Sequence, residues 1–327
     1  MKKVTVIGGG TGTFVVLSGL KQFAYDLGVI VTMMDSGGST GRLRDQLGVL
    51  PPGDLRQCLV ALSEAPLLWR KLFLYRFKSG DLEGHNFGNI FLSALEKVSS
   101  NYQEVIDTAI YVLKTKGKVI PVTFEKTHMC VKYESGKMVK GEGEIDKNYE
   151  EKTRVRDAFL DPMAKANPEA IERIKDSDYI IVGPGDLYAT IIPILLVSGI
   201  REAIKKSKTK IIYIMNLMTK SGQTTNYTAF DHLADLKRFT GEFPHCVIVN
   251  NGKIPDSIID WYTVHHEHIV KDDLAEKGYT GTVIHGDFVD SKLYSQSHED
   301  KYVDPRVRSI LRHDSEKLVQ AIRNLIG

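Results

Sequence analysis

The stretch DSGGSTGRLR, residues 35–44, gathers groups that bind phosphate. It joins one carboxylate to two adjacent glycines, three hydroxyls and two arginines. Glycine backbone N–H groups can approach an anion closely, and a guanidinium can hold phosphate through two parallel hydrogen bonds. We expect a ligand-binding loop here, with Arg42 or Arg44 on the phosphate; the alternative is a surface loop with solvated arginines. The expected contacts are Asp35, Gly37, Gly38, Ser39, Thr40 and Arg42.

A second glycine cluster, GGGTG at residues 8–12, follows the first apolar stretch of the chain. A glycine turn at the start of a helix lets backbone N–H groups point at an anion, whereas its alternative role is close packing alone. The dinucleotide fingerprint G-x-G-x-x-G is not met, because its last position falls on Thr13 or Val15. This disfavours a nicotinamide-dependent oxidoreductase, our third alternative. The expected contacts are Gly9, Gly10, Thr11 and Gly12.

Two further motifs contain candidates for acid–base or metal chemistry. In PPGDLRQ, Asp54 stands at an expected helix start, where it would either cap the helix or serve catalysis or metal binding. In GHNFGN, the asparagines Asn86 and Asn89 suit hydrogen bonds to a ligand, although Asn86 equally suits a cap. A histidine such as His85 can act as an acid or base near neutrality. The catalytic candidates are therefore Asp35, Asp54 and His85, of which the two aspartates could hold magnesium.

The motif GPGD, residues 183–186, precedes a helix that we expect to begin near Tyr188. Two helix N-termini facing one cleft would suit a diphosphate. Because a carboxylate repels an anion, we expect Asp186 to cap the helix, hold a cation or meet a hydroxyl. Two later strand ends, NLMT and NNG, each contribute an asparagine. The expected contacts in these motifs are Gly183, Gly185, Asp186, Tyr188, Asn216 and Asn250.

The composition excludes several classes of protein. The 327 residues carry a formal net charge of +2 without a long block of either sign, which argues against nucleic acid as a partner. The longest apolar run, residues 191–200, contains Pro193 and Gly199 and is shorter than the ~20 residues of a membrane-spanning helix. Three well-separated cysteines suit reduced core thiols in a cytoplasmic protein. The cluster HHEH, residues 265–268, lacks the H-E-x-x-H spacing of a zinc site, so we expect it to be solvated.

The elements that must position these motifs alternate between strands and helices. We predict an α/β fold with a Rossmann-like, doubly wound and mostly parallel sheet, as one domain over residues 1–327. It carries a helical insertion at about 54–113 and a small antiparallel β annex at about 118–161, with a hairpin turn at ESGK. Asp314 is expected to cap a last helix. Strands are predicted at 3–7, 29–34, 178–182, 210–215, 246–249 and 282–285, and helices at 14–23, 191–204 and 227–239.

The polar motifs follow the strands of this predicted sheet. In an open parallel sheet all carboxyl ends lie along one edge, and ligands bind in the crevice there. We therefore expect the loops after residues 7, 34 and 182 to converge on one electropositive groove shaped for a pyrophosphate.

With these motifs, the chain resembles the CofD-like superfamily, and more closely its YvcK-like branch, the gluconeogenesis factors. The motifs occur in the expected order over almost the whole chain: VIGGGTG, DSGGSTGRLR, PPGDLRQ, GHNFGN, GKVIPV, IIVGPGDLY, NLMT, YTAFDHL, VNNGKIP and RHD. The resemblance implies a nucleotide-diphosphate crevice at the carboxyl edge of the sheet. By matching position, its nucleotide contacts would be Gly10, Thr11, Gly12, Ser39, Arg42, Gly185 and Asn216, with Tyr262 and Arg312 as further candidates.

The resemblance implies two kinds of function. CofD itself is a 2-phospho-L-lactate transferase that uses a guanosine-linked donor, whereas YvcK-like proteins resemble binders of uridine-diphosphate sugars that support cell shape and wall synthesis during gluconeogenesis. Ser36 stands where the family often has a second acid or asparagine, and Asp186 where it often has serine. With few acids beside Asp35, magnesium binding would be weak, which favours binding over catalysis.

We therefore expect a cytoplasmic nucleotide-sugar-binding regulator that needs no cofactor. The alternative is a CofD-type transferase that uses magnesium. The expected partner is a uridine-diphosphate sugar or another nucleotide diphosphate, with neither nucleic acid nor membrane insertion. The segment PLLWRKLFLYRF, residues 66–77, could also pack against a second copy as a homo-oligomer, although Trp69 and Phe73 are expected in the core.

Overall fold

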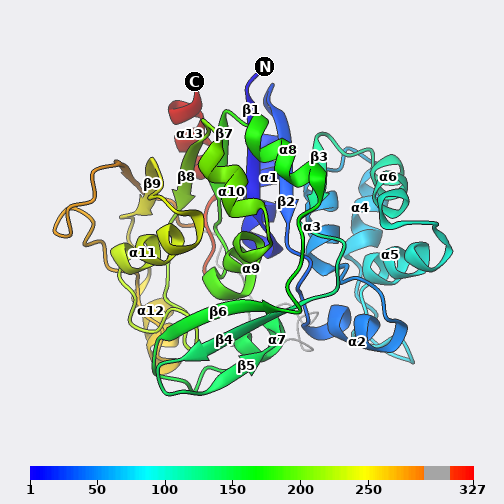
Figure 1. The fold of residues 1–327 in the computed structure, drawn as a ribbon, viewed down its shortest axis with the longest axis horizontal. Helices are drawn as coiled ribbons and strands as arrows, with labels where there is room; N and C mark the ends of the chain where they lie inside the picture. Colours follow the sequence, from blue (N-terminus) through cyan, green and yellow to red (C-terminus); the bar gives the residue numbers. More distant parts are fainter. Residues whose placement is uncertain (291–309) are drawn as a thin grey trace.

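A seven-stranded parallel sheet forms the centre of the molecule in the computed structural model, which describes residues 1–290 and 310–327 (Figure 1). Its strand order is β10-β9-β8-β7-β1-β2-β3. The order turns at β1, from which the chain runs outward to β2 and β3 on one side and, in its second half, to β7 through β10 on the other. The strands are β1 (Lys3–Gly8), β2 (Asp26–Val31), β3 (Lys118–Pro121), β7 (Tyr179–Val182), β8 (Lys210–Ile214), β9 (Cys246–Asn250) and β10 (Thr282–Gly286).

Helices cover both faces of this sheet, because its central strands are apolar on both sides. Along β1, Val6 belongs to one buried cluster and Ile7 to the other, as expected when successive side chains point to opposite faces. The first cluster includes residues of α1 (Gly10–Leu20) and α13 (Ser315–Ile326), and the second includes α8 (Pro168–Asp176), α10 (Ile200–Lys206) and α11 (Ala229–Thr240). The predicted doubly wound α/β architecture is confirmed.

The stretch predicted as helical does fold into helices. It contains α3 (Gly53–Leu62), α4 (Leu67–Leu74), α5 (Phe87–Val98) and α6 (Tyr102–Leu113). Phe73 is fully buried against Phe87 and Phe91, as predicted, whereas Trp69 is 40% exposed and does not belong to the core. Trp69 lies beside exposed Leu67 and Leu68 near the start of α4.

The β annex is a separate three-stranded antiparallel sheet of β4 (His128–Tyr133), β5 (Met138–Lys140) and β6 (Val155–Asp161), in the order β5-β4-β6. The predicted hairpin between β4 and β5 is confirmed. The predicted annex began too early, because β3 pairs with β2 in the main sheet. It also missed a short helix, α7 (Glu142–Asp146), that follows β5.

The helix predicted at 191–204 is broken into α9 (Ile192–Leu196) and α10, and the single π-helical turn η1 (Leu187–Ile191) directly precedes α9. Val197 is extended and Gly199 has φ +100°, a conformation that suits glycine and ends the regular helix. Two helices of nine residues each, α8 and α12 (Asp256–Val264), were not predicted.

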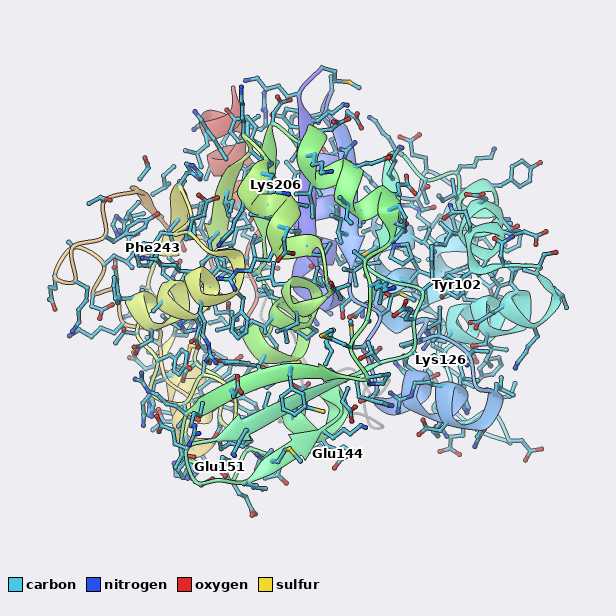
Figure 2. All side chains as sticks on the ribbon, in the orientation of Figure 1. Tyr102, Lys126, Glu144, Glu151, Lys206 and Phe243 are labelled. Carbon is cyan, nitrogen blue, oxygen red and sulfur yellow. The ribbon has the colours of Figure 1, made fainter. Side chains whose placement is uncertain are left out.

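Other predictions are confirmed. Asp314 caps α13 by accepting hydrogen bonds from the backbone N–H groups of Glu316 and Lys317, and all three cysteines are free and buried. The labelled charged residues Lys126, Glu144 and Lys206 are exposed on the surface (Figure 2). Within residues 1–290 and 310–327, no helix has the length and apolar character needed to cross a bilayer.

Candidate functional site

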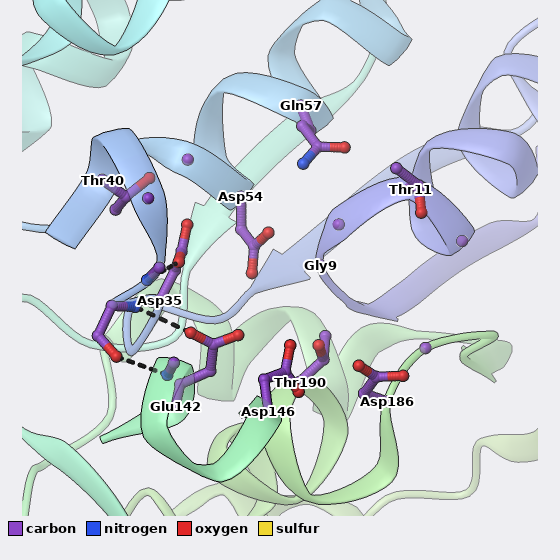
Figure 3. Close-up of a pocket in the computed structure, with 18 of the residues that line it drawn as sticks. Gly9, Thr11, Asp35, Thr40, Asp54, Gln57, Glu142, Asp146, Asp186 and Thr190 are labelled. Carbon is purple, nitrogen blue, oxygen red and sulfur yellow. Dashed lines mark hydrogen bonds between the residues drawn. The ribbon is translucent and has the colours of Figure 1, made fainter. Parts of the chain in front are cut away.

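A cleft of about 1200 Å³ lies at the carboxyl edge of the main sheet. The segments that follow β1, β2, β7 and β8 all line it, so the predicted convergence of remote loops is confirmed (Figure 3). The annex closes the opposite side through α7. Of the residues proposed as ligand contacts, the cleft is lined by Gly9, Gly10, Thr11, Gly12, Asp35, Gly37, Gly38, Ser39, Thr40, Arg42, Asn89, Gly185, Asp186, Asn216, Tyr262 and Arg312.

The glycine turn after β1 presents the N-terminus of α1 to the cleft. Gly9 is the N-cap and no side chain of its own caps the helix, while Gly10 has φ +66°. Gly12 is required by packing, because a Cβ there would lie 2.2 Å from the carbonyl oxygen of Pro184. The two interpretations of the turn are therefore compatible: Gly12 brings two loops together, and the first N–H groups of α1 lie at the cleft.

The segment DSGGSTGRLR is a loop only as far as Gly37, and the expected long loop is wrong. α2 (Gly38–Leu47) begins directly afterwards, with Gly37 as an N-cap that has no side chain and with no acidic residue in the first turn. Ser39 and Thr40 are buried in this first turn. The carboxylate of Asp35 accepts a hydrogen bond from the N–H of Gly37 at 2.9 Å. A second helix N-terminus therefore faces the cleft, beside the first.

The arginines of this segment differ in their surroundings. Arg42 is exposed at the cleft and donates to the carbonyl oxygen of Glu83 at 3.1 Å. Arg44 instead pairs with its neighbour Asp45 at 2.9 Å and does not line the cleft. Arg42 is thus the arginine of the two that can reach a ligand.

A buried arginine, Arg56, also lines the cleft and was not proposed as a contact. Its Nε donates to the side-chain oxygen of Asn89 at 2.8 Å, and Asn89 donates to the hydroxyl of Thr40 at 3.3 Å. This chain of hydrogen bonds fixes the guanidinium near the start of α2. The signal is the arginine of PPGDLRQ, two positions after Asp54.

Asp54 does not cap α3, whose N-cap is Pro52 and which has no side-chain cap. Its carboxylate instead lies against the glycine turn, where a Cβ on Gly9 would be 2.4 Å from Asp54 Oδ2 (Figure 3). Burial raises the pKa of Asp54 to about 8, and the nearby carboxylate of Asp35 adds to the shift. Near neutral pH, Asp54 therefore holds a proton in the folded protein.

The annex brings two more acids, Glu142 and Asp146, to the floor of the cleft (Figure 3). Glu142 accepts a hydrogen bond from the N–H of Ser36 at 3.0 Å, and Ser36 Oγ accepts one from the N–H of Gly143 at 2.7 Å. Burial raises the pKa of Asp146 to about 7, and burial together with neighbouring carboxylates raises that of Glu142 well above its usual range.

The prediction that the groove is electropositive is therefore wrong at the floor of the cleft, because the side chains there are acidic. The inference from Ser36 that few acids lie beside Asp35 is also wrong, since α7 supplies them. No helical signal for α7 is present in the sequence, because its five residues follow the hairpin directly and contain two glutamates, a glycine and an aspartate.

Lys220, also missed, is largely buried on the same floor. Its Nζ lies 3.2 Å from Asp186 Oδ2 and 3.9 Å from Asp146 Oδ1. Burial alone would lower the pKa of Lys220, but these two carboxylates raise it above its usual value. Asp186 does not cap η1, so of its three expected roles the structure supports contact with a cationic group, here an ammonium. Burial raises the pKa of the neighbouring Glu267 to about 7.

Five proposed residues do not line the cleft: His85, Asn86, Gly183, Tyr188 and Asn250. His85 Nδ1 lies 3.2 Å from Ser39 Oγ, and burial lowers its pKa. Asn86 caps α5, as its alternative interpretation predicted. The hydroxyl of Tyr188 donates to Asp235 at 2.6 Å, and Asn250 accepts from the N–H groups of Gly252 and Phe288. Tyr188, Asn86 and Asn250 therefore have structural partners, and His85 lies behind Ser39.

The described residues of the cleft supply only part of the ligand set of a magnesium site. Carboxylate oxygens are ligands that Mg²⁺ accepts, and Asp35 and Asp54 both line the cleft. Yet no three acidic, histidine or cysteine side chains among the described residues are arranged to hold a metal ion. The same holds for HHEH, in which His266 and His268 are exposed and only Glu267 is buried.

Comparisons with known proteins agree with this geometry. A family profile described as "2-phospho-L-lactate transferase CofD" matches residues 4–289. The "Putative gluconeogenesis factor" of Aquifex aeolicus is 39% identical and aligns with 100% of this chain and 98% of its own length. The "Gluconeogenesis factor" of Bacillus subtilis is 37% identical over 99% of this chain and 98% of its own. A crystal structure of a UPF0052-family protein from Bacillus halodurans has a TM-score of 0.87 at 36% identity, covering 98% and 99% of the two chains.

Proposed function

The chain belongs to the CofD family, within it to the gluconeogenesis factors, and we propose that it binds a uridine-diphosphate sugar in the cleft. The bound diphosphate lies between the N-termini of α1 and α2, and Arg42 closes on it from the rim. The protein acts as a regulator that responds to this nucleotide sugar and supports cell-wall synthesis and cell shape during gluconeogenesis.

The observation that carries this proposal is the pair of helix N-termini on one cleft whose N-cap residues are both glycines. α1 and α2 each begin after a glycine, with no side chain on the N-cap and no acidic residue of their own in the first turn. Their backbone N–H groups and helix dipoles favour an anion. Two such termini match the two phosphates of a diphosphate.

The rest of the cleft suits the sugar and the base. Its volume of about 1200 Å³ exceeds the ~300–1,000 Å³ of ordinary small-molecule pockets, which leaves room for a nucleoside and a hexose beside the diphosphate. Carboxylates such as Asp35 and Glu142 accept hydrogen bonds from sugar hydroxyls. Asn216 donates to the carbonyl oxygen of Gly185 at 3.0 Å and lines the cleft, where its side chain can form hydrogen bonds with the base or the ribose.

The second candidate is a CofD-type transferase, favoured by the acids on the cleft floor. When bound, magnesium would supply charge neutralisation for phosphoryl transfer. Asp35 and Asp54 would hold it, and Arg56, fixed by Asn89, would add positive charge beside the transferred group.

Isothermal titration separates these functions. The ligands are UDP-glucose, UDP-N-acetylglucosamine, UDP, GDP and NAD, each with and without magnesium. We expect the uridine ligands to bind without the metal and NAD not to bind. Tight guanosine binding that requires magnesium would favour the transferase instead, and absence of binding by every uridine ligand would refute the proposed function.

A further inference from the structure

Gln223 lies behind the cleft and joins two of its walls. The side chain is 1% exposed. Its Oε1 accepts hydrogen bonds from the backbone N–H groups of Tyr188 at 3.3 Å and Ala189 at 3.1 Å. Its Nε2 donates to Asp146 Oδ1 at 2.5 Å. Gln223 does not itself line the cleft.

The first wall that Gln223 holds is the GPGD loop. A helical segment leaves its first N–H groups without partners inside the segment, and a side chain at the N-cap ordinarily accepts from them. The N-cap of η1 is Asp186, but its side chain makes no cap hydrogen bond. Gln223, 37 positions away in the sequence, accepts the hydrogen bonds that a cap would accept. Asp186 is thereby left to face the cleft and pair with Lys220 at 3.2 Å.

The second wall is the annex. Asp146 is the last residue of α7, and its carboxylate faces Gln223 and, at 3.9 Å, Lys220. Neighbours of Gln223 also contact this part of the chain: Ser221 Oγ donates to the carbonyl oxygen of Tyr149 at 2.7 Å. The turn that contains Gln223 therefore contacts the annex at more than one point.

We propose that Gln223 is a positioning residue that sets the spacing between the GPGD loop and Asp146, and thereby the affinity of the cleft for its ligand. The proposal rests on the proposed function for its ligand only. A glutamine is required by the chemistry, because one end must accept from two N–H groups while the other donates to a carboxylate. Glutamate has no donor when ionised, and methionine has neither an amide donor nor a carbonyl acceptor.

A reciprocal exchange of the two side chains tests this requirement. In Gln223→Glu, a carboxylate faces the carboxylate of Asp146, and we expect UDP-glucose to bind at least about tenfold more weakly. Adding Asp146→Asn supplies an amide donor from the other side, so the double variant should bind within about threefold of Asp146→Asn alone. Asp146→Asn alone is the reference, because it measures what the loss of the Asp146 charge on the cleft floor costs while its side-chain oxygen can still accept from Gln223.

Two measurements are made on each of these variants. Isothermal titration gives the affinity for UDP-glucose, and hydrogen exchange gives the protection of the Tyr188 and Ala189 amides without any ligand. The affinity should fall in Gln223→Met and Gln223→Glu and recover in the double variant, whereas amide protection should fall most in Gln223→Met, which has no acceptor. Gln223→Met also shows whether the two amides need an acceptor.

Two results would overturn the inference: wild-type affinity in Gln223→Glu, or a double variant no better than that single one. If the wild-type protein itself fails to bind uridine ligands, the proposed function fails. In that case unchanged amide protection in Gln223→Met would overturn the positioning role, whereas its loss there and its retention in the double variant would support it. A melting temperature measured for each variant shows whether it is folded.

Discussion

Replacing Asp54 by asparagine should stabilise the protein, and the gain should grow with pH. The carboxyl group lies against the glycine turn at Gly9 and near Asp35, and burial raises its pKa from 3.8 to about 8. Between these values the folded chain holds a proton that the unfolded chain releases. Stability therefore falls as pH rises through this window. An asparagine is neutral at every pH and removes this cost.

The size of the effect follows from the shift. Each pH unit above 3.8 costs about 1.4 kcal/mol, which sums to about 4 kcal/mol at pH 7 for a fully desolvated group. Because Asp54 is only half-buried and borders the open cleft, solvent screening reduces this to about 2 kcal/mol. For a chain of 327 residues, that corresponds to an increase of ~3 °C in the melting temperature at pH 7.

The assay is urea unfolding of the wild type and of Asp54→Asn at pH 5, 6, 7 and 8. The difference in unfolding free energy should increase steadily from pH 5 to pH 8. Asp81→Asn, at an exposed position outside the cleft, is the matched control and should differ little from the wild type at any pH. A gain that is independent of pH, or a variant that becomes less stable than the wild type at pH 8, would refute the reasoning about Asp54.

Three further variants test other parts of the cleft and fold. Arg42→Ala should weaken UDP binding by ~1.5–3 kcal/mol, the contribution of a charge-assisted hydrogen bond, and unchanged affinity in titration would remove Arg42 from the site. Gly12→Ala should lower the unfolding free energy by ~1–3 kcal/mol, since its Cβ would lie 2.2 Å from the Pro184 carbonyl oxygen. The control Gly185→Ala makes only ordinary contacts and should be tolerated. Equal melting temperatures for the two variants would contradict this packing role of Gly12. Asp314→Ala should cost ~0.5–2 kcal/mol in urea unfolding through the lost cap of α13, and no loss would show that the cap adds nothing.

The central part of the fold could be predicted because its signals are local. A short apolar strand, a glycine turn and helical spacing define β1, α1 and β2, and an aspartate before an amphipathic stretch defines the cap of α13. The carboxyl-edge rule then places the turns after β1, β2 and β7 in one cleft. For the same reason the break after α9 was missed: α9 lies in a continuous apolar run, residues 191–200, whose interruption depends on Gly199.

The electrostatics of the cleft could not be predicted, because they depend on contacts between distant segments. Glu142 and Asp146 reach the cleft only because α7 docks on Ser36 and Gln223, across more than 75 positions of sequence. Lys220 is largely buried beside them in the loop after β8. Helix starts were also ambiguous in sequence: Asp54 looks like a cap, yet Pro52 occupies that place.

The most direct test is a crystal structure of the protein with UDP-glucose bound. We predict that both phosphates lie between Gly10 at the start of α1 and Gly38 at the start of α2, within hydrogen-bond distance of backbone N–H groups, with the sugar over the acidic floor. A diphosphate bound elsewhere on the molecule, or held in the cleft without contact to either helix N-terminus, would contradict the account.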